Sequence, residues 1–399
     1  MSEWMWNLIT WGGGGVLLLL LAIWGHLTFW AWYYRQREVC GTLSWIYSDD
    51  GWRIALEHIP ARRGVPARGQ VICCPGLACN GRVFHLREGL SMARALSEEG
   101  WSVWIFHPRG TGPSEHPEGD RQPYGYREYV ADALAVVDFV QARADLPLMW
   151  VGHSLGGLVG LDVALRKPQA FDALVTLGTP IALSQHTIGP LHYSIFKWFC
   201  RGLKTAYLGK ISTLVAPWSG WLPFLHPAPL YVNFDLIDKA DLRTALAQCF
   251  DDTPRQVLDE FVDAIEREAG PWDRIKDELA RLNVPLLAIM GGRDALAPLE
   301  VTTPISDVGP HGQTECYQLE AYGHLELVLS TGVELEVIPK IMSWWSEVRA
   351  ASVVRSSAES SATLSLHSAS PHSSLSDDDT RPETEERAQI QSMISPNAG

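Results

Sequence analysis

The chain has 399 residues, which is long enough for one large domain or two ordinary ones with a sizeable core. Its formal net charge is −14 and it has no basic stripe with interleaved aromatic residues, so we expect no nucleic-acid partner. Its seven cysteines are odd in number and irregularly spaced, which argues against a disulfide framework or a zinc site. We expect buried free thiols, no metal and no cofactor.

The first feature along the chain is an apolar segment, residues 11–34, which contains no Asp, Glu, Lys or Arg. Its 24 residues are enough to cross a bilayer as a helix. Aromatic residues gather at both ends, as they do at membrane interfaces: Trp4, Trp6, Trp11, Trp30, Trp32, Tyr33 and Tyr34. A cleaved signal peptide would need a basic start, but the only charged side chain before the segment is the acidic Glu3. We therefore predict a membrane anchor over residues 1–38, with a buried core helix as the alternative.

The charges that flank this segment predict its orientation. Arg35 and Arg37 follow it directly, whereas no Lys or Arg precedes it. Because positive residues stay on the cytoplasmic side, we expect the N-terminus outside and the rest of the chain in the cytoplasm. Reduced thiols fit that compartment.

The next part of the chain alternates between strand-like and helix-like patterns. Residues 43–46 and 52–56 flank Asp49-Asp50-Gly51, which indicates a hairpin. Four apolar runs follow, separated by helical patterns such as residues 129–142; the runs are 71–74, 102–106, 148–151 and 173–177. This alternation predicts an α/β fold with a mostly parallel sheet covered by helices on both faces.

The alternation stops over residues 182–282, which are rich in aromatic residues and prolines. One helix is predicted there, with Thr253 as its cap, Pro254 in its first turn and Gly270-Pro271 as its stop. We interpret the stretch as a helical cap inserted over the carboxyl edge of the sheet. Additional core is the alternative.

The sheet pattern resumes with residues 284–290 and 315–319, and a final helix is predicted over 333–348. Beyond residue 351 the chain becomes rich in Ser, Asp and Glu and lacks the apolar content to order itself. The predicted domains after the anchor are therefore a globular domain over residues 39–350 and a disordered acidic tail over residues 351–399.

One short motif points to chemistry. Gly152-His153-Ser154-Leu155-Gly156 lies between an apolar strand and a helical pattern, so Ser154 is predicted to sit on a sharp strand-to-helix turn. A serine hydroxyl is a poor nucleophile unless a base accepts its proton. His153 is interpreted as a packing residue rather than that base.

Candidates for the base and its supporting acid follow the two strands after the cap. Asp294 comes directly after residues 284–290, and His324 comes shortly after residues 315–319. Alone, each residue has an ordinary interpretation as a turn or surface residue. Because the carboxyl ends of parallel strands meet at one edge of a sheet, we predict the catalytic set Ser154, Asp294 and His324.

Attack of a serine on a carbonyl group also needs backbone N–H donors for the carbonyl oxygen, which becomes negative. One is predicted to be Leu155, directly after the nucleophile. The other is predicted in the loop after residues 71–74, where Gly76 allows the backbone to approach closely, and Leu77 is the candidate.

From Leu43 to Val348 the chain resembles the α/β-hydrolase superfamily. The resemblance rests on the motif around Ser154, the loop 109–114, Gly292-Arg293-Asp294 and Gly323-His324-Leu325-Glu326. It implies the α/β-hydrolase fold and a lipase-like or esterase-like serine hydrolase. The loop 109–114 is interpreted as a structural turn. Two positions depart from the usual pattern: Pro75-Gly76 replaces His-Gly, and Glu326 replaces Asp.

The predicted function is a membrane-anchored hydrolase that cleaves a lipophilic acyl ester through an acyl-enzyme intermediate. Two alternatives stay open. The acyl-enzyme could be resolved by an alcohol or thiol, as in an acyltransferase, or formed from a thioester. The fold could also serve as a non-catalytic binding module. The sequence indicates no oligomeric state.

Overall fold

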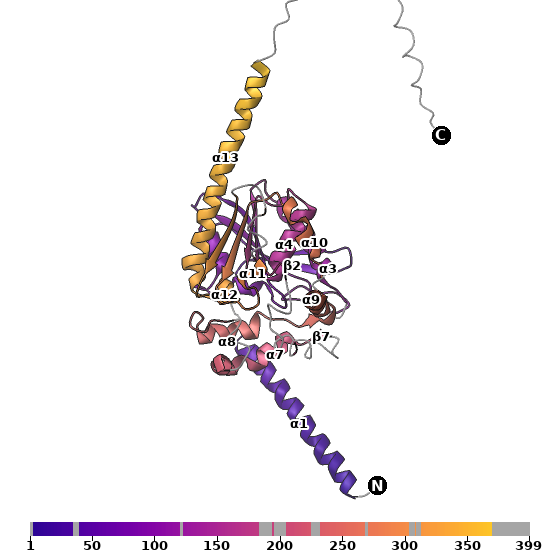
Figure 1. The fold of residues 1–399 in the computed structure, drawn as a ribbon. Helices are drawn as coiled ribbons and strands as arrows, with labels where there is room; N and C mark the ends of the chain where they lie inside the picture. Colours follow the sequence, from indigo (N-terminus) through magenta and orange to yellow (C-terminus); the bar gives the residue numbers. More distant parts are fainter. Residues whose placement is uncertain are drawn as a thin grey trace, which may run out of the picture. The chain divides into compact units, whose positions relative to one another are not determined.

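The structure is a computed structural model that describes residues 3–34, 40–119, 123–182, 194, 205–224, 232–267, 270–302, 308 and 313–368. The chain divides into two compact units, Met1–Val348 and Arg349–Gly399. The first unit contains the sheet and the helices that cover it (Figure 1).

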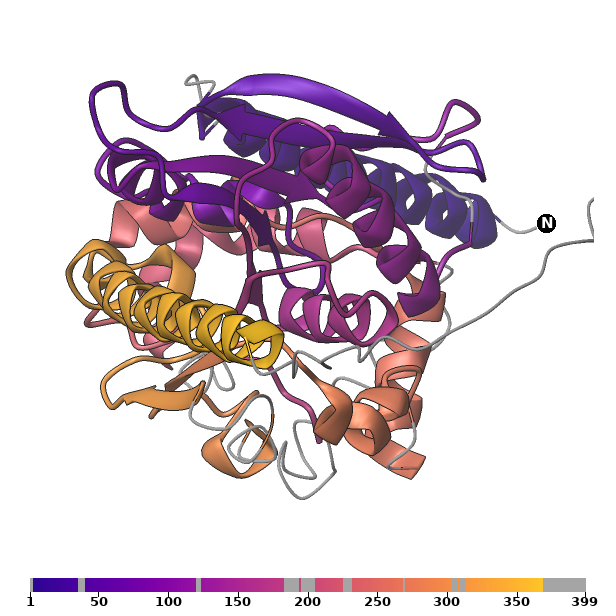
Figure 2. The ribbon, with the colours of Figure 1, turned by 90° about the horizontal axis from the view of Figure 1, so that it is seen from above.

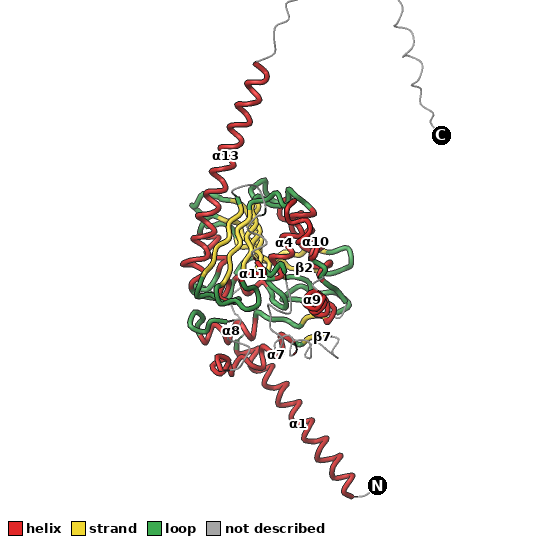
Figure 3. The backbone as a smooth tube through the Cα atoms, in the orientation of Figure 1, coloured by secondary structure: helices red, strands yellow, loops and turns green. Residues whose placement is uncertain are grey.

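Eight strands form one sheet in the order β1-β2-β4-β3-β5-β6-β9-β10. Figure 3 shows the strands in yellow. The strands are β1 (Thr42–Tyr47), β2 (Arg53–Ile59), β3 (Gly69–Cys74), β4 (Trp101–His107), β5 (Leu148–His153), β6 (Ala173–Leu177), β9 (Leu286–Gly291) and β10 (Thr314–Leu319). β1 and β2 form the predicted hairpin, and β2 also pairs antiparallel with β4. All other neighbours in this sheet are parallel, so the prediction of a mostly parallel sheet is confirmed.

Helices cover both faces of the sheet (Figure 2). One core cluster includes residues of α3 (Tyr126–Gln141), α4 (Leu155–Arg166) and α10 (Asp273–Glu278), and the other includes α2 (Met92–Glu98), α12 (Glu326–Leu329) and the first turns of α13 (Ile338–Ser368). Along β3 the side chains alternate, because Ile72 and Cys74 belong to the first cluster and Val71 and Cys73 to the second. A strand buried on both faces needs apolar residues throughout, which explains the continuous apolar runs. Cys73, Cys74 and Cys79 are free and buried.

A mostly helical insertion, called the cap below, separates β6 from β9. Its described elements are β7 (Thr205–Ala206), α7 (Leu208–Val215), η2 (Ala216–Phe224), α8 (Lys239–Gln248), β8 (Thr253–Pro254), α9 (Arg255–Arg267), α10 and η4 (Leu279–Arg281). The prediction that Thr253 caps a helix and Pro254 begins it is wrong. Both residues pair with β7 instead, and the helix begins at Arg255. The partner strand lies far away in sequence, so local signals could not indicate this pairing.

Helix α1 runs without a break from Glu3 to Tyr33. Within it, Gly13–Tyr33 is long and apolar enough to cross a membrane, and none of its most apolar window is buried. Val16 and Leu18 are 59% and 69% exposed, which argues against a core helix. A single N-terminal helix of this kind fits a membrane span or a signal sequence. Its C-terminal half contacts α7 and α8 of the cap.

A π-helical segment, Val333–Val337, leads into α13. Ile341, Trp344 and Trp345 of this helix are buried in the core beside the sheet. We expected the helix to end near Val348 and the chain to be disordered from residue 351, but α13 continues to Ser368. No Gly or Pro interrupts residues 349–368, so nothing local stops the helix. Residues 369–399 lie outside the described residues, and the disordered tail there stays a prediction.

Candidate active site

Ser154 lies on the sharp turn that joins β5 to α4. Its φ of 53° and ψ of −120° fall in a region that residues with side chains rarely adopt, at a cost of about 1–3 kcal/mol. The turn is held on both sides, because the Ser154 N–H donates to the Leu177 carbonyl at 2.8 Å and the Thr179 hydroxyl donates to the Ser154 carbonyl at 3.2 Å. This geometry places a serine at the carboxyl end of a central strand, as nucleophile turns do.

Asp294 and His324 follow β9 and β10 and are hydrogen-bonded to each other. The distance between His324 Nδ1 and Asp294 Oδ2 is 2.7 Å, and both residues are buried. Asp294 Oδ1 accepts the backbone N–H groups of Leu296 at 2.9 Å and Ala297 at 2.8 Å. Burial raises the pKa of Asp294, but the His324 charge and these hydrogen bonds outweigh it and lower the pKa below its usual value. These contacts favour the ionised carboxylate of Asp294, which is hydrogen-bonded to the His324 ring.

The Ser154 turn and the pair formed by Asp294 and His324 meet around Gly178. Gly178 directly follows Leu177, the hydrogen-bond partner of Ser154, and adopts a φ of +55°. A β-carbon at Gly178 would lie 3.0 Å from Asp294 Oδ2 and 3.2 Å from His324 Nδ1, so only glycine fits there. Among the described residues, no direct hydrogen bond joins the Ser154 hydroxyl to the His324 ring. Asp294 and His324 are paired, and Ser154 lies on the neighbouring turn.

The two predicted backbone donors lie on either side of Ser154. A β-carbon on Gly76 would lie 3.0 Å from the Ser154 β-carbon, so the loop with Leu77 approaches the turn closely. In the described part of the chain, the N–H groups of Leu77 and Leu155 donate to no protein group. Gly76 and Leu155 also line a cavity of about 10 Å³, room for about one water molecule. Free N–H groups beside a small cavity could receive a negative oxygen.

Hydrogen bonds tie the loop that carries Leu77 to the end of α8. The Asn80 N–H donates to the Cys249 carbonyl at 3.0 Å, and the Asp251 N–H donates to the Ala78 carbonyl at 2.8 Å. The Asn80 side-chain amide donates to the Gln248 carbonyl at 2.9 Å and to Asp251 Oδ2 at 2.8 Å. These bonds hold Ala78 at a φ of 56°. Asp251 was missed by the sequence analysis, because no motif connects residues so far apart in sequence.

We predict that Asn80→Ala lowers kcat more than it changes KM. The substitution removes the side-chain bonds to Gln248 and Asp251 and lets the loop with Leu77 relax. Loss of one oxyanion donor typically costs about 10²–10³ in kcat, so partial misplacement should cost about tenfold or more. Steady-state kinetics with a soluble ester measures this. A proportional loss in the amount of folded protein, with unchanged kcat per folded molecule, would contradict the prediction.

Two buried titratable groups flank His324. His153 donates from Nε2 to the His324 carbonyl at 3.0 Å, and burial lowers the pKa of His153 to about 3, with a contribution from His324. The buried His153 ring packs against the His324 ring, with 4.7 Å between the ring centroids, which agrees with its interpretation as a packing residue. Glu326 is fully buried, and its carboxylate accepts the Gly323 N–H at 2.8 Å, which fixes the loop that carries His324. Burial raises the pKa of Glu326 to about 7.

The raised pKa of Glu326 predicts a pH-dependent stability. Between the usual carboxyl pKa of 4.5 and about 7, the unfolded chain releases the proton that the folded chain keeps. The contribution of protonated Glu326 to the free energy of unfolding is therefore complete below pH 4.5 and is lost as the pH rises through 7. The free energy of unfolding should fall by about 3 kcal/mol over this range. Glu326→Gln should remove this dependence, so its melting temperature relative to wild type should rise from pH 4.5 to pH 8. Parallel curves for the two proteins would contradict the prediction.

Arg109, in the loop after β4, is a structural residue. Its guanidinium is buried and forms hydrogen bonds with Asp132 at 2.6 and 2.7 Å, and its Nη1 donates to Asp50 at 2.6 Å. These carboxylates come from α3 and from the turn between β1 and β2. The interpretation of this loop as a structural turn is confirmed.

Comparison with known proteins identifies what the chain is similar to. The alpha/beta hydrolase fold family matches residues 69–331. Pimeloyl-(acyl-carrier protein) methyl ester esterase from Neisseria meningitidis serogroup B is 27% identical over 233 residues, which cover 53% of this chain and 80% of the relative. The protein of the same name from Hamiltonella defensa is 23% identical over 207 residues, covering 51% of this chain and 72% of the relative. The crystal structure of a soluble variant of monoglyceride lipase from Saccharomyces cerevisiae superimposes with a TM-score of 0.57, at 17% identity, over 79% of this chain and 98% of that one.

Proposed function

Because this chain belongs to the alpha/beta hydrolase fold family, we propose that it is a serine hydrolase that cleaves a carboxylic ester through an acyl-enzyme intermediate. The observation that carries the proposal is the 2.7 Å hydrogen bond between His324 Nδ1 and Asp294 Oδ2, on loops beside the Ser154 turn. The names of the related methyl ester esterases support an ester as the substrate.

In the first half of the reaction, the Ser154 hydroxyl oxygen attacks the ester carbonyl carbon while His324 Nε2 accepts the hydroxyl proton. The Asp294 carboxylate holds the Nδ1 proton and stabilises the imidazolium that forms. The carbonyl oxygen becomes negative and accepts hydrogen bonds from the N–H groups of Leu77 and Leu155. When the tetrahedral intermediate collapses, His324 gives its proton to the leaving alcohol, and the acyl group stays on Ser154.

In the second half, water replaces the alcohol. His324 accepts a proton from the water as it attacks the acyl-enzyme carbonyl, and the same N–H groups stabilise the second oxyanion. Collapse releases the carboxylic acid and returns the proton to Ser154. The reaction consumes one ester and one water and yields one acid and one alcohol.

We further propose that the substrate is a lipophilic acyl ester and that α1 anchors the protein in a membrane. The exposed apolar surface of Gly13–Tyr33 and the aromatic residues of the cap support this proposal. Arg35 and Arg37 support an orientation with the N-terminus outside and the catalytic domain in the cytoplasm. Labelling of a cysteine introduced at Ser2 tests the orientation: reagent should reach it from outside the cell only, and modification from the cytoplasmic side would refute it.

An acyltransferase or a thioesterase would use the same residues. In an acyltransferase an alcohol or thiol takes the acyl group from Ser154 instead of water, and in a thioesterase the acyl group comes from a thioester instead of an ester. The ester chemistry in the relatives' names favours hydrolysis. Added acceptor alcohol distinguishes the two: a transferase forms a new ester in proportion to the alcohol, whereas a hydrolase yields the acid.

A fluorophosphonate probe tests the proposal directly, because it labels only a serine that a base has activated. The wild type should be labelled, and Ser154→Ala should not. Hydrolysis of esters of increasing acyl chain length by the same two proteins then gives the chain-length preference. Absence of labelling in a folded wild type would favour a non-catalytic binding protein.

A further inference from the structure

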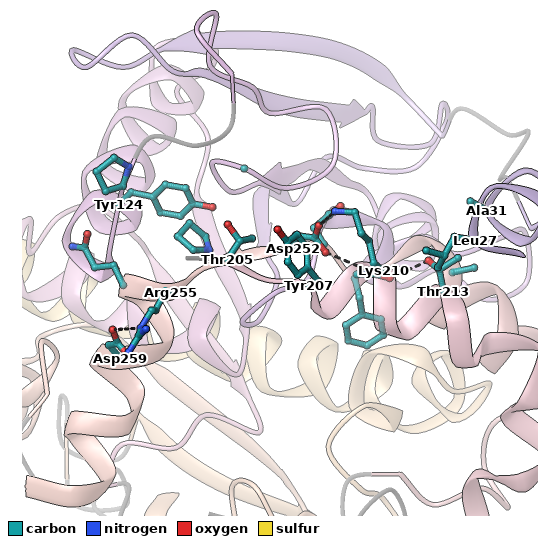
Figure 4. A pocket seen from close by; sticks show the side chains of 18 of the residues that line it. Leu27, Ala31, Tyr124, Thr205, Tyr207, Lys210, Thr213, Asp252, Arg255 and Asp259 are labelled. Atoms are coloured by element: carbon teal, nitrogen blue, oxygen red, sulfur yellow. Dashed lines mark hydrogen bonds and ion pairs between the residues drawn. The ribbon is translucent and has the colours of Figure 1, made fainter. Parts of the chain in front are cut away.

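A groove lies between the C-terminal half of α1 and the cap, apart from the site described above (Figure 4). Its volume is about 1400 Å³. Leu27 and Ala31 of α1 form one end, Tyr207 and Lys210 lie along the middle, and Arg255 of α9 lies at the other end. Ser154, Asp294 and His324 do not line it. The proposed reaction gives this groove no role, although its volume is large enough for a ligand.

If Gly13–Tyr33 spans a membrane, the α1 end of the groove lies near the boundary between headgroups and acyl chains. His26 of α1 contacts the Leu214 carbonyl of α7 at 3.2 Å, and Gln248 of α8 donates to the Ala31 carbonyl at 3.2 Å. His26 precedes the end of the apolar segment by seven residues, or about 10 Å along the helix. Interfacial elements sit about 5–10 Å into this boundary. If Gly13–Tyr33 spans the membrane, the cap therefore reaches the lipid surface.

The exposed tryptophans of the cap agree with that placement. Trp218 and Trp221 on η2 are 59% and 65% exposed, and η2 packs against α7, which contacts α1. Tryptophan is enriched at membrane interfaces, because its ring is apolar and its N–H can remain hydrated. The part of the cap nearest α1 thus offers a surface suited to lipid.

The inner wall of the groove adjoins the loop that carries Leu77. Asp251 lines the groove, and its N–H donates to the Ala78 carbonyl at 2.8 Å, while its Oδ2 accepts the Gly112 N–H at 2.9 Å. Gly110 lines the groove and the next residue, Thr111, lines the small cavity beside Leu155. The groove therefore runs from the C-terminal half of α1 to residues that contact the loop with Leu77.

The charged lining of the groove is negative. Five carboxylates line it against two cations, Lys210 and Arg255; the carboxylates belong to Asp251, Asp252, Asp259, Glu260 and Asp263. Lys210 pairs with Asp252 and Arg255 pairs with Asp259, so both cations are already neutralised. Asp263 pairs at 3.5 Å with Arg267, which is outside the lining, so Asp251 and Glu260 are the lining carboxylates for which the described residues give no ion pair. Glu260 accepts the Tyr126 N–H at 2.7 Å instead of pairing with a cation. An anionic headgroup would meet repulsion here, whereas an uncharged one would meet donors and acceptors.

We propose that this groove binds the lipid ester before hydrolysis and selects esters with an uncharged headgroup. The acyl chain enters beside Leu27 and Ala31 from the bilayer, and the headgroup reaches the carboxylates near Glu260. This inference rests on the proposed function and on the membrane anchor. It adds to them the route by which the substrate enters and the absence of charge on its headgroup.

The test uses the full chain in phosphatidylcholine vesicles and two esters, a long-chain monoacylglycerol in the bilayer and a short soluble nitrophenyl ester. Leu27→Trp and Ala31→Trp fill the groove, and Leu20→Trp is the matched control, because Leu20 is on the same helix, 57% exposed and outside the groove. The groove variants should lose about tenfold in kcat/KM on the bilayer ester and keep their rate on the soluble ester. Equal losses on both esters, or no loss on either, would overturn the inference.

A binding measurement separates this inference from the proposed function. A fluorescent monoalkylglycerol ether in the vesicles, which has no ester bond, should bind the Ser154→Ala protein and bind more weakly when Leu27→Trp is added. Weakened binding supports the groove even if no ester is hydrolysed, and unchanged binding overturns it even if hydrolysis is observed.

The charge selection has its own test. The wild type should hydrolyse a monoacylglycerol faster than the matched acylglycerol phosphate, which has the same ester and an anionic headgroup. Asp263→Lys should narrow this difference, because it replaces one negative charge of the lining with a positive one and removes the ion pair of Asp263 with Arg267. Equal rates on the two lipids in the wild type would overturn the charge selection.

Discussion

Replacing Ser154 with Ala is expected to lower kcat for ester hydrolysis by about 10⁴-fold or more, since no other group in the site can form the acyl-enzyme. Among the described residues the Ser154 hydroxyl has no hydrogen-bond partner, so its removal should leave the fold intact. The backbone strain at φ 53° is the same for Ala as for Ser. Kinetics with a soluble ester and a melting curve measure the two effects separately.

The matched control for this variant is Ser97→Ala. Ser97 and Ser154 are equally buried, each 7% exposed, but Ser97 lies on α2 and donates to the Pro60 carbonyl at 2.8 Å. Ser97→Ala should lower the melting temperature somewhat and keep kcat near the wild-type value. Residual activity of Ser154→Ala above a few per cent of wild type would mean that another residue is the nucleophile, and would refute the proposed function.

Asp294→Asn is expected to lower kcat by about 10⁴-fold while changing KM little. The Asp294 carboxylate accepts the proton on His324 Nδ1 at 2.7 Å, which leaves Nε2 free to accept the Ser154 proton. An amide in the same place can donate to Nδ1, so the histidine carries its proton on Nε2 and cannot act as a base. The bonds from Leu296 and Ala297 to Oδ1 have the same geometry in Asn, so the loop should keep its shape.

Asp162→Asn provides the comparison for Asp294→Asn. Asp162 is also a buried carboxylate, but it pairs with Arg166 at 2.8 Å on α4 and does not contact the site histidine. Its substitution should cost stability through the lost ion pair and leave kcat within a fewfold of wild type. If Asp294→Asn retained near-normal kcat at pH 7, His324 would not depend on this carboxylate, and the proposed role of Asp294 would be wrong.

The sequence predicted the sheet better than the cap. Strands such as Leu148–His153 were predictable because a strand buried on both faces must be apolar along its whole length. In the cap, Thr253 and Pro254 have the residue types of a helix start, yet they pair with Thr205 and Ala206. There the strand pairing with a distant segment decided the local structure, against the helix-start preference of the two residues.

The candidate site divides in the same way. Ser154, Asp294 and His324 could be proposed together because each follows a strand, and parallel strands end at one edge. The bonds from Asn80 to Gln248 and Asp251 could not be proposed, since they depend on where α8 ends above the loop. The groove beside Leu27 likewise exists only because α1 packs on α7.

By itself, the sequence determined the apolar N-terminal helix, the order of strands and helices and the serine turn, because periodicity and glycine spacing act over a few residues. Only the tertiary structure decided the distance between His324 and Asp294, the raised pKa of Glu326, and the packing of α1 against α7 and α8 of the cap. Those properties depend on burial and on contacts between residues that the chain itself keeps far apart, and local patterns contain no record of either.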